Sequence, residues 1–411
     1  MKGNAVALEV RSSRDLSVDE RQLIATAQLD GMAPLEAWRV VGTNRQLAYS
    51  THGVFRFFGK FPPPIARHLI EQFTRPREWV LDPMMGSGTT AVEALDLERH
   101  AVVRDVSPLS TLLCRVKTRH VSPRDSQLAL GRVARRLATA KPATLPTPVD
   151  LRHANHWFLP ETTTSLGRIR AAIDEEPAEP LRELLLTAFL STVRRVSKAT
   201  TQQGRLFLDV ATAEPDAWPT FETRAKRYAE AVAALPRTRG SHLSIQQRDA
   251  RTRAESPSRF KLAITHPPYF NNYKYSSINS LELAWLGVPR QAIRNGEVRE
   301  AFKVGKPERV GQYVEDLATA IASITQELVP GGVLALMMGD TIIRDTYVNV
   351  TRELIGEVRR RVPSLALDRI VLRVPRYTEA SWVASQRRSG DRVGVTLCDF
   401  ILILSKKDPP R

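Results

Sequence analysis

The chain has 411 residues, 42% of them hydrophobic and 25% charged, which is enough apolar material for a large core and two domains. Its 60 Lys and Arg exceed its 44 Asp and Glu, and the net charge of +16 favours a polyanionic partner such as nucleic acid. An arginine-biased genome is the alternative explanation. The two cysteines, Cys114 and Cys398, lie alone and far apart, which excludes a disulfide framework or a zinc knuckle.

No apolar run is long enough to span a bilayer, and residues 1–15 carry no long apolar stretch. We therefore expect a cytoplasmic protein without a membrane partner. Residues 1–50 are polar and are predicted to form a helical extension, with helices at Val18 to Leu29 and Pro34 to Val41. That extension carries no recognisable chemistry.

Residues 51–64 form an aromatic-rich, extended segment that ends in prolines. A helix is predicted next, from apolar residues at helical spacing, namely Ile65, Leu69, Ile70 and Phe73. A plain hydrophobic lid over the core is one interpretation of the extended segment.

The stretch from Trp79 to Thr90 is typical of a buried strand that turns sharply into a helix. An apolar run ends in Asp82, and Gly86 and Gly88 permit a turn at positive φ and the close approach of a ligand. The following helix is predicted over Thr89 to Leu97, with its free amides facing that ligand.

Three ligands could use this turn. A nucleoside triphosphate is disfavoured because Thr89 and Thr90 stand where a phosphate-binding loop has its lysine. A dinucleotide fits the G-x-G-x-x-G/A spacing, and Asp105, at the end of the next apolar run, lies at a suitable distance to hold a ribose. S-adenosylmethionine has a ribose but no phosphate, and it is the third candidate.

A second buried strand, Leu262 to Thr265, runs into His266, Pro267, Pro268 and Tyr269. The prolines fix a rigid turn at the carboxyl end of the strand, where ligands of open α/β sheets bind. A stiff turn without function is the alternative. Together with the glycine turn, this one favours a site for S-adenosylmethionine.

The sheet pattern stops after the helix predicted at Leu109 to Val116. Residues 120–239 are predicted to form helices only, at Ser126 to Thr139, Glu161 to Ile173, Leu181 to Val196 and Glu222 to Ala234. So long a stretch indicates an inserted helical subdomain. A polar cluster there is either a nucleic-acid contact or a solvated helix end; it comprises Arg194, Arg195, Ser197, Lys198, Thr200, Thr201, Gln202 and Gln203.

The sheet pattern resumes after the insertion. Strands are predicted at Leu243 to Gln247, Phe260 to Thr265, Val333 to Met338, Leu367 to Val374 and Val395 to Leu404, the last two antiparallel to each other. Helices are predicted at Ser277 to Trp285, Val314 to Leu328 and Val348 to Arg361. The expected fold is α/β, with a seven-stranded, mostly parallel, Rossmann-like sheet.

The motif Asp82-Pro83-x-x-Gly86-Ser87-Gly88-Thr89-Thr90, followed by Pro267-Pro268-Tyr269, resembles the bacterial DNA methyltransferases that methylate the exocyclic amines of cytosine (N4) or adenine (N6). The resemblance covers residues 50–118 and 244–405. It implies a methyltransferase sheet, S-adenosylmethionine as cofactor and double-stranded DNA as substrate. A cognate restriction endonuclease is a further partner that such a family allows.

The resemblance also implies the site residues. Cofactor binding falls to Lys60, Phe61, Pro62, Asp82, Pro83, Met84, Gly86, Ser87, Gly88, Thr89, Thr90, Asp105, Val106, Ser107, Asp249 and Ala250. Residues at positions like Lys60 to Pro62 close over the methionine end of the cofactor, and an acid at a position like Asp249 receives the adenine amine. Catalysis falls to His266, Pro267, Pro268 and Tyr269, with Tyr269 stacking on a base turned out of the duplex.

Position 266 departs from the family, which usually has Asp, Asn or Ser there. A neutral histidine accepts one hydrogen bond and a protonated histidine accepts none, so activity that rests on His266 is expected to fall in acid. The alternative is that His266 points away and the backbone and Thr265 hold the amine. Because neutral His266 lacks the charge of Asp, cytosine N4 is favoured over adenine N6. RNA amine methylation and an inactive nucleic-acid-binding protein are rival hypotheses.

Basic and polar residues downstream of Tyr269 are predicted to bind nucleic acid, namely Asn271, Asn272, Lys274, Arg290, Arg294, Lys303 and Lys306. The segment around Arg290 to Arg309 is interpreted as a basic loop that orders on DNA, against a merely solvated loop. The polar segment Arg376 to Arg392 is another candidate loop.

The predicted domain organisation follows from these patterns. We expect an N-terminal helical extension (1–50), a cofactor-binding part of the methyltransferase domain (51–118), an inserted helical subdomain with a candidate role in target recognition (119–240), and a second part of the methyltransferase domain with the catalytic turn (241–411).

Overall fold

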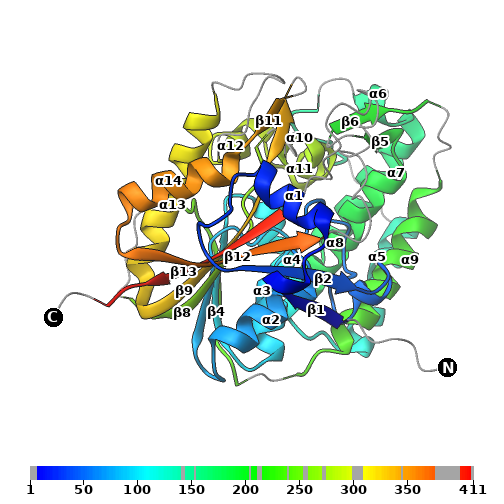
Figure 1. The fold of residues 1–411 in the computed structure, drawn as a ribbon. Helices are drawn as coiled ribbons and strands as arrows, with labels where there is room; N and C mark the ends of the chain where they lie inside the picture. Colours follow the sequence, from blue (N-terminus) through cyan, green and yellow to red (C-terminus); the bar gives the residue numbers. More distant parts are fainter. Residues whose placement is uncertain are drawn as a thin grey trace.

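A nine-stranded mixed sheet runs through the protein (Figure 1). The structure is a computed structural model that describes residues 7–139, 144–151, 154–202, 205–210, 215–237, 240–252, 258–270, 275–298, 309–343, 346–374 and 399–408. The strands of the sheet are β1 (Ala7–Ser12), β2 (Leu35–Val41), β3 (Trp79–Asp82), β4 (His100–Asp105), β7 (Leu243–Gln247), β8 (Phe260–Thr265), β9 (Leu328–Gly339), β12 (Leu365–Val374) and β13 (Asp399–Lys406).

The strand order across the sheet is β1-β2-β12-β13-β9-β8-β3-β4-β7. The run β9-β8-β3-β4-β7 is parallel throughout, whereas β13 is antiparallel to both of its neighbours, β12 and β9. This arrangement confirms the mostly parallel, Rossmann-like α/β sheet expected from the sequence. It also confirms the antiparallel pairing of the two strands nearest the C-terminus.

The N-terminal extension differs from its prediction. Helix α1 (Val18–Thr26) forms as expected, but the helix predicted at Pro34 to Val41 is wrong because those residues form strand β2. Strand β2 pairs in parallel with β12 and antiparallel with β1, so the extension adds two strands to the seven that the sequence predicts. Tertiary pairing overrides local helix propensity here, and it buries Trp38 completely.

Helices cover both faces of the sheet. One face packs against α13 (Val310–Glu327) and α14 (Val350–Arg361), and the other against α2 (Pro63–Phe73) and α3 (Thr89–Asp96). Strand β9 contributes side chains to the hydrophobic cores on both faces, because alternate side chains of a strand point to opposite faces of the sheet. Its Leu334, Leu336 and Met338 join the first core, and Ala335 and Met337 join the second.

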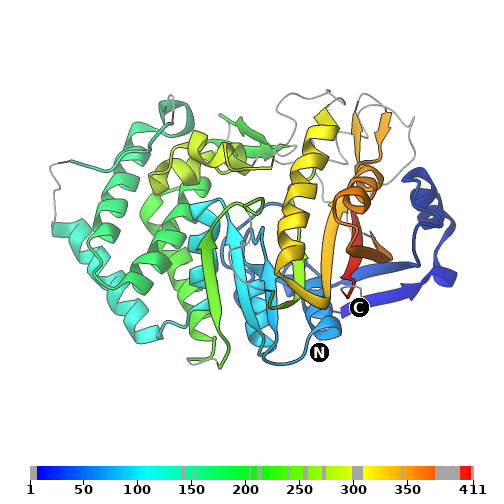
Figure 2. The ribbon, with the colours of Figure 1, turned by 90° about the vertical axis from the view of Figure 1, so that its left-hand side faces the viewer.

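Residues between β4 and β7 form a largely helical insertion, which Figure 2 shows at one side of the molecule. After α4 (Pro108–Thr118) come α5 (Pro123–Thr139), α6 (Ala154–Trp157), α7 (Pro160–Asp174), α8 (Glu179–Arg195) and α9 (Ala217–Ala233). The prediction of helices only was wrong in one place, because β5 (Ala199–Gln202) and β6 (Arg205–Leu208) form an antiparallel hairpin. The insertion shares a hydrophobic core with α4, through side chains such as Leu112 and Phe189.

Short elements follow β8 and β9 at one edge of the sheet (Figure 1). They are α10 (Tyr275–Ile278), α11 (Ser280–Leu286), α12 (Arg290–Arg294), β10 (Thr341–Ile343) and β11 (Thr346–Val348). The interpretation of residues 290–309 as a loop is therefore wrong for α12, and residues 299–308 lie outside the described part of the chain.

A buried ion pair joins two distant parts of the chain. Arg104 on β4 donates hydrogen bonds of 2.6 and 2.8 Å to the two carboxylate oxygens of Glu327, at the end of α13. The two side chains are 6% and 1% exposed. Because burying an unpaired charge is costly, each partner depends on the other for its place in the core.

Of the helices that the structure describes, none combines the length and the apolar composition that crossing a bilayer demands.

Gly88 gives a test of how tightly the start of α3 is packed. Its φ is +78°, and a Cβ there would lie 2.9 Å from the Cys114 sulfur and 3.2 Å from the Cys114 Cα on α4. Gly88→Ala is expected to lower the free energy of unfolding by about 2–5 kcal/mol, because left-handed backbone costs an alanine roughly 1–2 kcal/mol and overpacking roughly 1–3 kcal/mol. Urea unfolding followed by circular dichroism measures the change.

Gly356→Ala is the matched control. A Cβ there meets nothing within 4 Å in the described part of the chain, and α14 is regular at that point. Since alanine favours a helix interior over glycine, this variant is expected to gain about 0.5–1 kcal/mol. Equal effects of the two substitutions would contradict the packing argument for Gly88.

Candidate functional site

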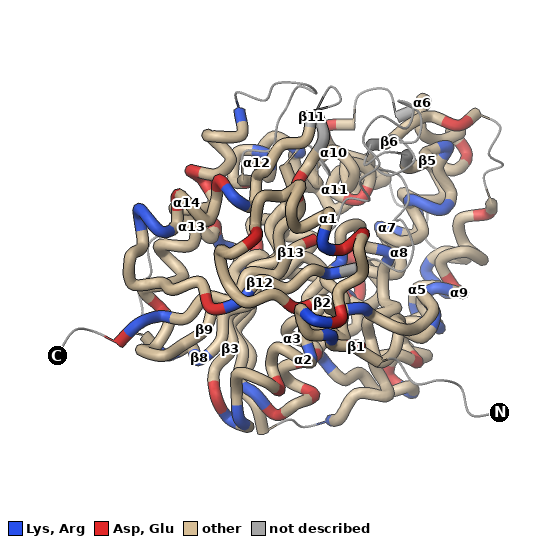
Figure 3. Tube along the Cα trace, in the orientation of Figure 1, with Lys and Arg blue, Asp and Glu red and all other residues tan. Residues whose placement is uncertain are grey.

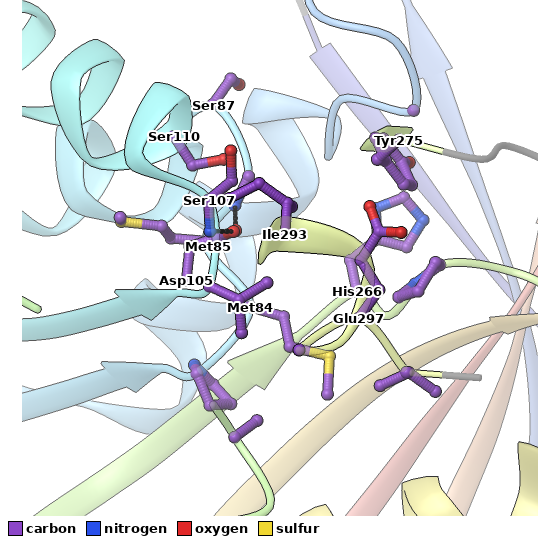
Figure 4. Close-up of a pocket in the computed structure, with 18 of the residues that line it drawn as sticks. Met84, Met85, Ser87, Asp105, Ser107, Ser110, His266, Tyr275, Ile293 and Glu297 are labelled. Atoms are coloured by element: carbon purple, nitrogen blue, oxygen red, sulfur yellow. Dashed lines mark hydrogen bonds between the residues drawn. The ribbon is translucent and has the colours of Figure 1, made fainter. Parts of the chain in front are cut away.

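A cavity that is partly open to solvent lies at the carboxyl ends of β3, β4, β7 and β8 (Figure 4). Most of the sequence-predicted site residues line it: Lys60, Phe61, Asp82, Pro83, Met84, Gly86, Ser87, Asp105, Val106, Ser107, Asp249, Ala250, His266 and Pro268. Others from the same prediction are not among the lining residues: Pro62, Gly88, Thr89, Thr90, Pro267 and Tyr269.

The glycine turn forms the floor between β3 and α3. Asp82 ends β3, and its carboxylate accepts a hydrogen bond of 3.1 Å from the Met84 amide. Burial raises the pKa of Asp82 to about 7. Gly86, at φ +49°, lines the cavity, whereas the space beside Gly88 is filled by Cys114 of α4. Gly88 therefore serves the packing of two helices, in contrast to the expected approach of a ligand.

Asp105 ties the second strand end to the glycine turn. One of its carboxylate oxygens accepts from the Gly86 amide at 2.9 Å and the other from the Ser107 amide at 2.9 Å. Burial raises the pKa of this carboxyl to about 6, while the two amides favour its charged form. The Ser110 side chain also hydrogen-bonds this carboxyl, so Asp105 holds the turn in shape while it lines the cavity.

Two lysines lie near this turn, and Lys117 is buried whereas Lys60 is partly buried. Lys117 of α4 donates a 2.6 Å hydrogen bond to the Ser87 carbonyl, and burial lowers its pKa well below that of a free lysine. Lys60 lines the cavity and donates to the His52 carbonyl at 2.6 Å, and burial lowers its pKa to about 8. The polypeptide before α2 is therefore fixed beside the glycine turn, and Pro62 caps α2 next to it.

The proline turn after β8 brings His266 to the opposite wall. A hydrogen bond of 3.0 Å joins the His266 Nε2 and the Tyr269 hydroxyl. Burial, with a smaller contribution from the charge of nearby Arg373, lowers the pKa of His266 to about 3. His266 is therefore neutral in mild acid. The fall in activity expected from its protonation would accordingly occur only at much lower pH.

The other residues of this turn are held by packing. The Tyr313 hydroxyl on α13 donates to the Pro268 carbonyl at 2.6 Å. The ring of Tyr269 lies against Gly339, where an added Cβ would come within 2.6 Å of it. Tyr269 thus rests on the end of β9, and Gly339 must lack a side chain for it to do so.

Asp249 follows β7, as expected from the sequence, and lines the cavity with Ala250. Its carboxylate accepts from the Arg251 backbone amide at 2.8 Å and from the Arg251 guanidinium at 2.7 Å. Arg251 also bonds Asp316 of α13 at 3.1 Å. Asp249 is thereby committed to an arginine, which weakens it as an acceptor for an incoming ligand.

The sequence did not indicate the residues that cover the cavity. Figure 4 shows Asp105 and Ser107 on one side and His266, Tyr275 and Glu297 on the other. The unpredicted lining residues include Phe57, Ser110, Tyr275, Ser276, Asn279, Ile293, Gly296, Glu297 and Val298. Ser110 lies about one helical turn after Ser107, so this spacing could have predicted that Ser110 also lines the cavity. The segment 275–298 has no such signal, because tertiary packing places it there.

The predicted nucleic-acid contacts are only partly described. Arg290 and Arg294 lie on α12, whereas Asn271, Asn272, Lys274, Lys303, Lys306 and the segment 376–392 lie outside the described residues. Arg194 of the polar cluster is engaged inside the protein, since it bonds both carboxylate oxygens of Glu282 at 2.9 and 2.7 Å. Figure 3 shows acidic positions beside many of the basic ones along the described chain.

Comparison with known proteins gives a consistent assignment. Residues 12–108 match the family model N6_N4_Mtase, described as DNA methylase. The chain is 25% identical over 264 residues to the type II methyltransferase M.MvaI of Kocuria varians, covering 57% of each. It is 25% identical over 286 residues to the type II methyltransferase M.BsoBI of Geobacillus stearothermophilus, covering 61% of this chain and 55% of that protein. The chain thus spans little more than half the length of these relatives.

Solved structures with a similar arrangement are distant. An rRNA methyltransferase, AviRa from Streptomyces viridochromogenes, is 12% identical, with a TM-score of 0.33 and coverage of 89% of this chain and 94% of that one. TrmN from Thermus thermophilus is 13% identical, with a TM-score of 0.30 and coverage of 84% and 49%. Values this low support no statement about substrate.

The His266 ring is expected to stay neutral between about pH 8 and about pH 5, since its burial lowers its pKa to about 3. Carbon–proton correlation spectra of the histidine rings measure this directly, and His266→Gln identifies the resonance. A titration midpoint near that of free histidine would show that the ring is hydrated and that the cavity wall is built differently.

Proposed function

We propose that the chain is a DNA methylase of the family whose model matches residues 12–108, and that it transfers a methyl group from S-adenosylmethionine to an exocyclic amine of a base in duplex DNA. One observation carries the proposal: the glycine turn after β3 and the His266-Pro267-Pro268-Tyr269 turn after β8 meet at a single cavity. At such a junction a methyl donor bound by one turn would face an acceptor bound by the other.

The residues of the cavity fit the cofactor. Asp105 presents carboxylate oxygens suited to ribose hydroxyls, and the buried hydroxyl of Ser87 has no hydrogen-bond partner among the described residues. The flexible thioether of Met84 also lines the cavity. When bound, S-adenosylmethionine supplies an electrophilic methyl group attached to a sulfonium. Asp105, Ser87 and the segment from Lys60 to Phe61 would hold it.

The proposed role of the proline turn is to align the base amine. An aromatic amine is a weak nucleophile because its lone pair is delocalised into the ring. Hydrogen bonds from its two N–H groups, to the Pro267 carbonyl and to a ring nitrogen of His266, would localise that lone pair for a direct displacement. No covalent intermediate with the enzyme is needed. The low pKa of His266 supports this role, because only a neutral ring can accept.

Tyr269 connects base entry to that acceptor. In the described arrangement its hydroxyl is hydrogen-bonded to the His266 Nε2, so an amine that uses this nitrogen must displace it. We assign the freed ring to stacking on the extruded base. Tyr269 would thus hydrogen-bond the His266 Nε2 before the base arrives and stack on the base afterwards.

Cytosine N4 is the proposed target atom. A neutral acceptor at position 266 lacks the charge of an aspartate, which favours the cytosine reaction by the comparison within the family. Adenine N6 is the alternative. We further propose that Arg290, Arg294 and the inserted helices contact DNA, and the contact of β6 with α10 supports their position near the cavity mouth.

The purified protein is expected to transfer labelled methyl from S-adenosylmethionine to duplex DNA, with N4-methylcytosine released on enzymatic digestion. Mass spectrometry of the nucleosides identifies the product. N6-methyladenine would correct the base, preferential labelling of RNA would correct the substrate, and loss of all transfer with retained DNA binding would indicate an inactive binding protein.

Removing the side chain at position 266 tests the mechanism. His266→Ala is expected to lower kcat by about 10²-fold, the scale of losing one preorganised partner of the reacting group, with the cofactor Kd unchanged. His100→Ala, at the opposite end of β4, is the control and should retain activity. Full activity of His266→Ala in single-turnover measurements would leave the alignment to the backbone alone.

A further inference from the structure

Glu297 is an acidic side chain on the segment that covers the cavity, and the proposed chemistry gives it no role. It lies between Gly296 and Val298, and all three residues line the cavity. Figure 4 shows its carboxylate on the far side from Asp105. From the sequence this position falls in the predicted basic loop, where no function is expected of it.

Neighbouring residues fix the Glu297 carboxylate in place. The Ser276 amide donates to one of its oxygens at 2.8 Å, and the Ser276 hydroxyl donates to the other at 2.9 Å. Each carboxylate oxygen can accept two hydrogen bonds, so each retains one lone pair. Ser276 itself is buried, on α10. The carboxylate is therefore held in one orientation with spare capacity to accept.

The backbone at this point is also anchored. Arg251 donates to the Gly296 carbonyl at 3.2 Å. A Cβ on Gly296 would lie 3.2 Å from a methyl of Val106, the residue directly after Asp105. The covering segment is thus packed against the end of β4, and Val298 is buried beside it.

Glu297 and Asp105 act on each other electrically. The negative charge of Glu297 contributes to the raised pKa of Asp105, although burial is the main cause. Burial likewise raises the pKa of Glu297. The charge of nearby Arg294 partly offsets that of Glu297, and a ligand that brings hydrogen-bond donors between the two carboxylates would further reduce their repulsion.

We propose that Glu297 binds the ribose hydroxyls of the methyl donor, from the wall opposite Asp105. The inference rests on the proposed function. A vicinal diol carries two O–H donors, which matches two carboxylates that each have lone pairs left to accept them. Two more acids line the cavity: Asp249 is paired with the guanidinium of Arg251, and Asp82 accepts a hydrogen bond from the Met84 amide inside the glycine turn, so Glu297 is better placed to accept.

Isothermal titration calorimetry without DNA tests the assignment. The ligands are S-adenosylmethionine, S-adenosylhomocysteine, and the 2′-deoxy and 3′-deoxy analogues of the latter. Glu297→Gln is expected to weaken the first two ligands equally, by roughly tenfold, because a charged acceptor is replaced by a neutral amide. In the wild type, removing a ribose hydroxyl from the ligand is expected to weaken binding. In Glu297→Gln this weakening should be smaller, by a factor similar to the loss of affinity for the intact ligands.

Controls separate this role from others. Glu161→Gln, on the exposed first turn of α7, removes the same charge away from the cavity and should bind like the wild type. Glu297→Asp keeps the charge but withdraws it by one methylene, so an intermediate loss is expected. Thermal melting without ligand checks that each variant is folded.

Three outcomes would overturn the assignment. Equal sensitivity of wild type and Glu297→Gln to loss of a ribose hydroxyl would make Glu297 merely structural. A loss confined to S-adenosylmethionine would make it a partner of the sulfonium charge. Unchanged affinities for every ligand would remove it from binding altogether. In contrast, a wild type that binds none of these ligands would refute the proposed function itself.

Discussion

The parallel pairing of β3 with β8 is the constraint on which the site depends. Val80 lies opposite Leu262 and Leu81 opposite Ala263, so the two strands end side by side. Each strand is then followed by a turn of unusual composition, one rich in glycine and one rich in proline. Their side chains meet at one cavity although about 180 residues of sequence, including the insertion, separate them. Backbone hydrogen bonds between β3 and β8 thereby bring together two turns that are far apart in the sequence.

Much of this arrangement was predictable from the sequence, because the strands around the site are short, apolar and bounded by turn residues. Strands β7 and β8 have the predicted limits, and the acids Asp82, Asp105 and Asp249 stand at the expected strand ends. A buried parallel strand carries its signal in its own residues.

What the sequence did not reveal depends on contacts between distant residues. Strand β2 forms because it pairs with the edge of β12. The apolar spacing of its own residues suits a helix and does not predict this pairing. Gly88 looks like part of a ligand-binding loop, but its missing side chain accommodates Cys114. The low pKa of His266 likewise follows mainly from its burial, and the sequence around position 266 does not predict how deeply the ring is buried. Segment 275–298 reaches the cavity through tertiary contacts, among them those of Gly296 with Val106 and Arg251.

The pair formed by Arg104 and Glu327 has a consequence for synthesis of the protein on the ribosome. The first partner emerges early and the second follows 223 residues later. Until then, the guanidinium on β4 has no counter-charge, and closing the core around it would be costly. We therefore expect the core around Arg104 to close only after Glu327 has been synthesised.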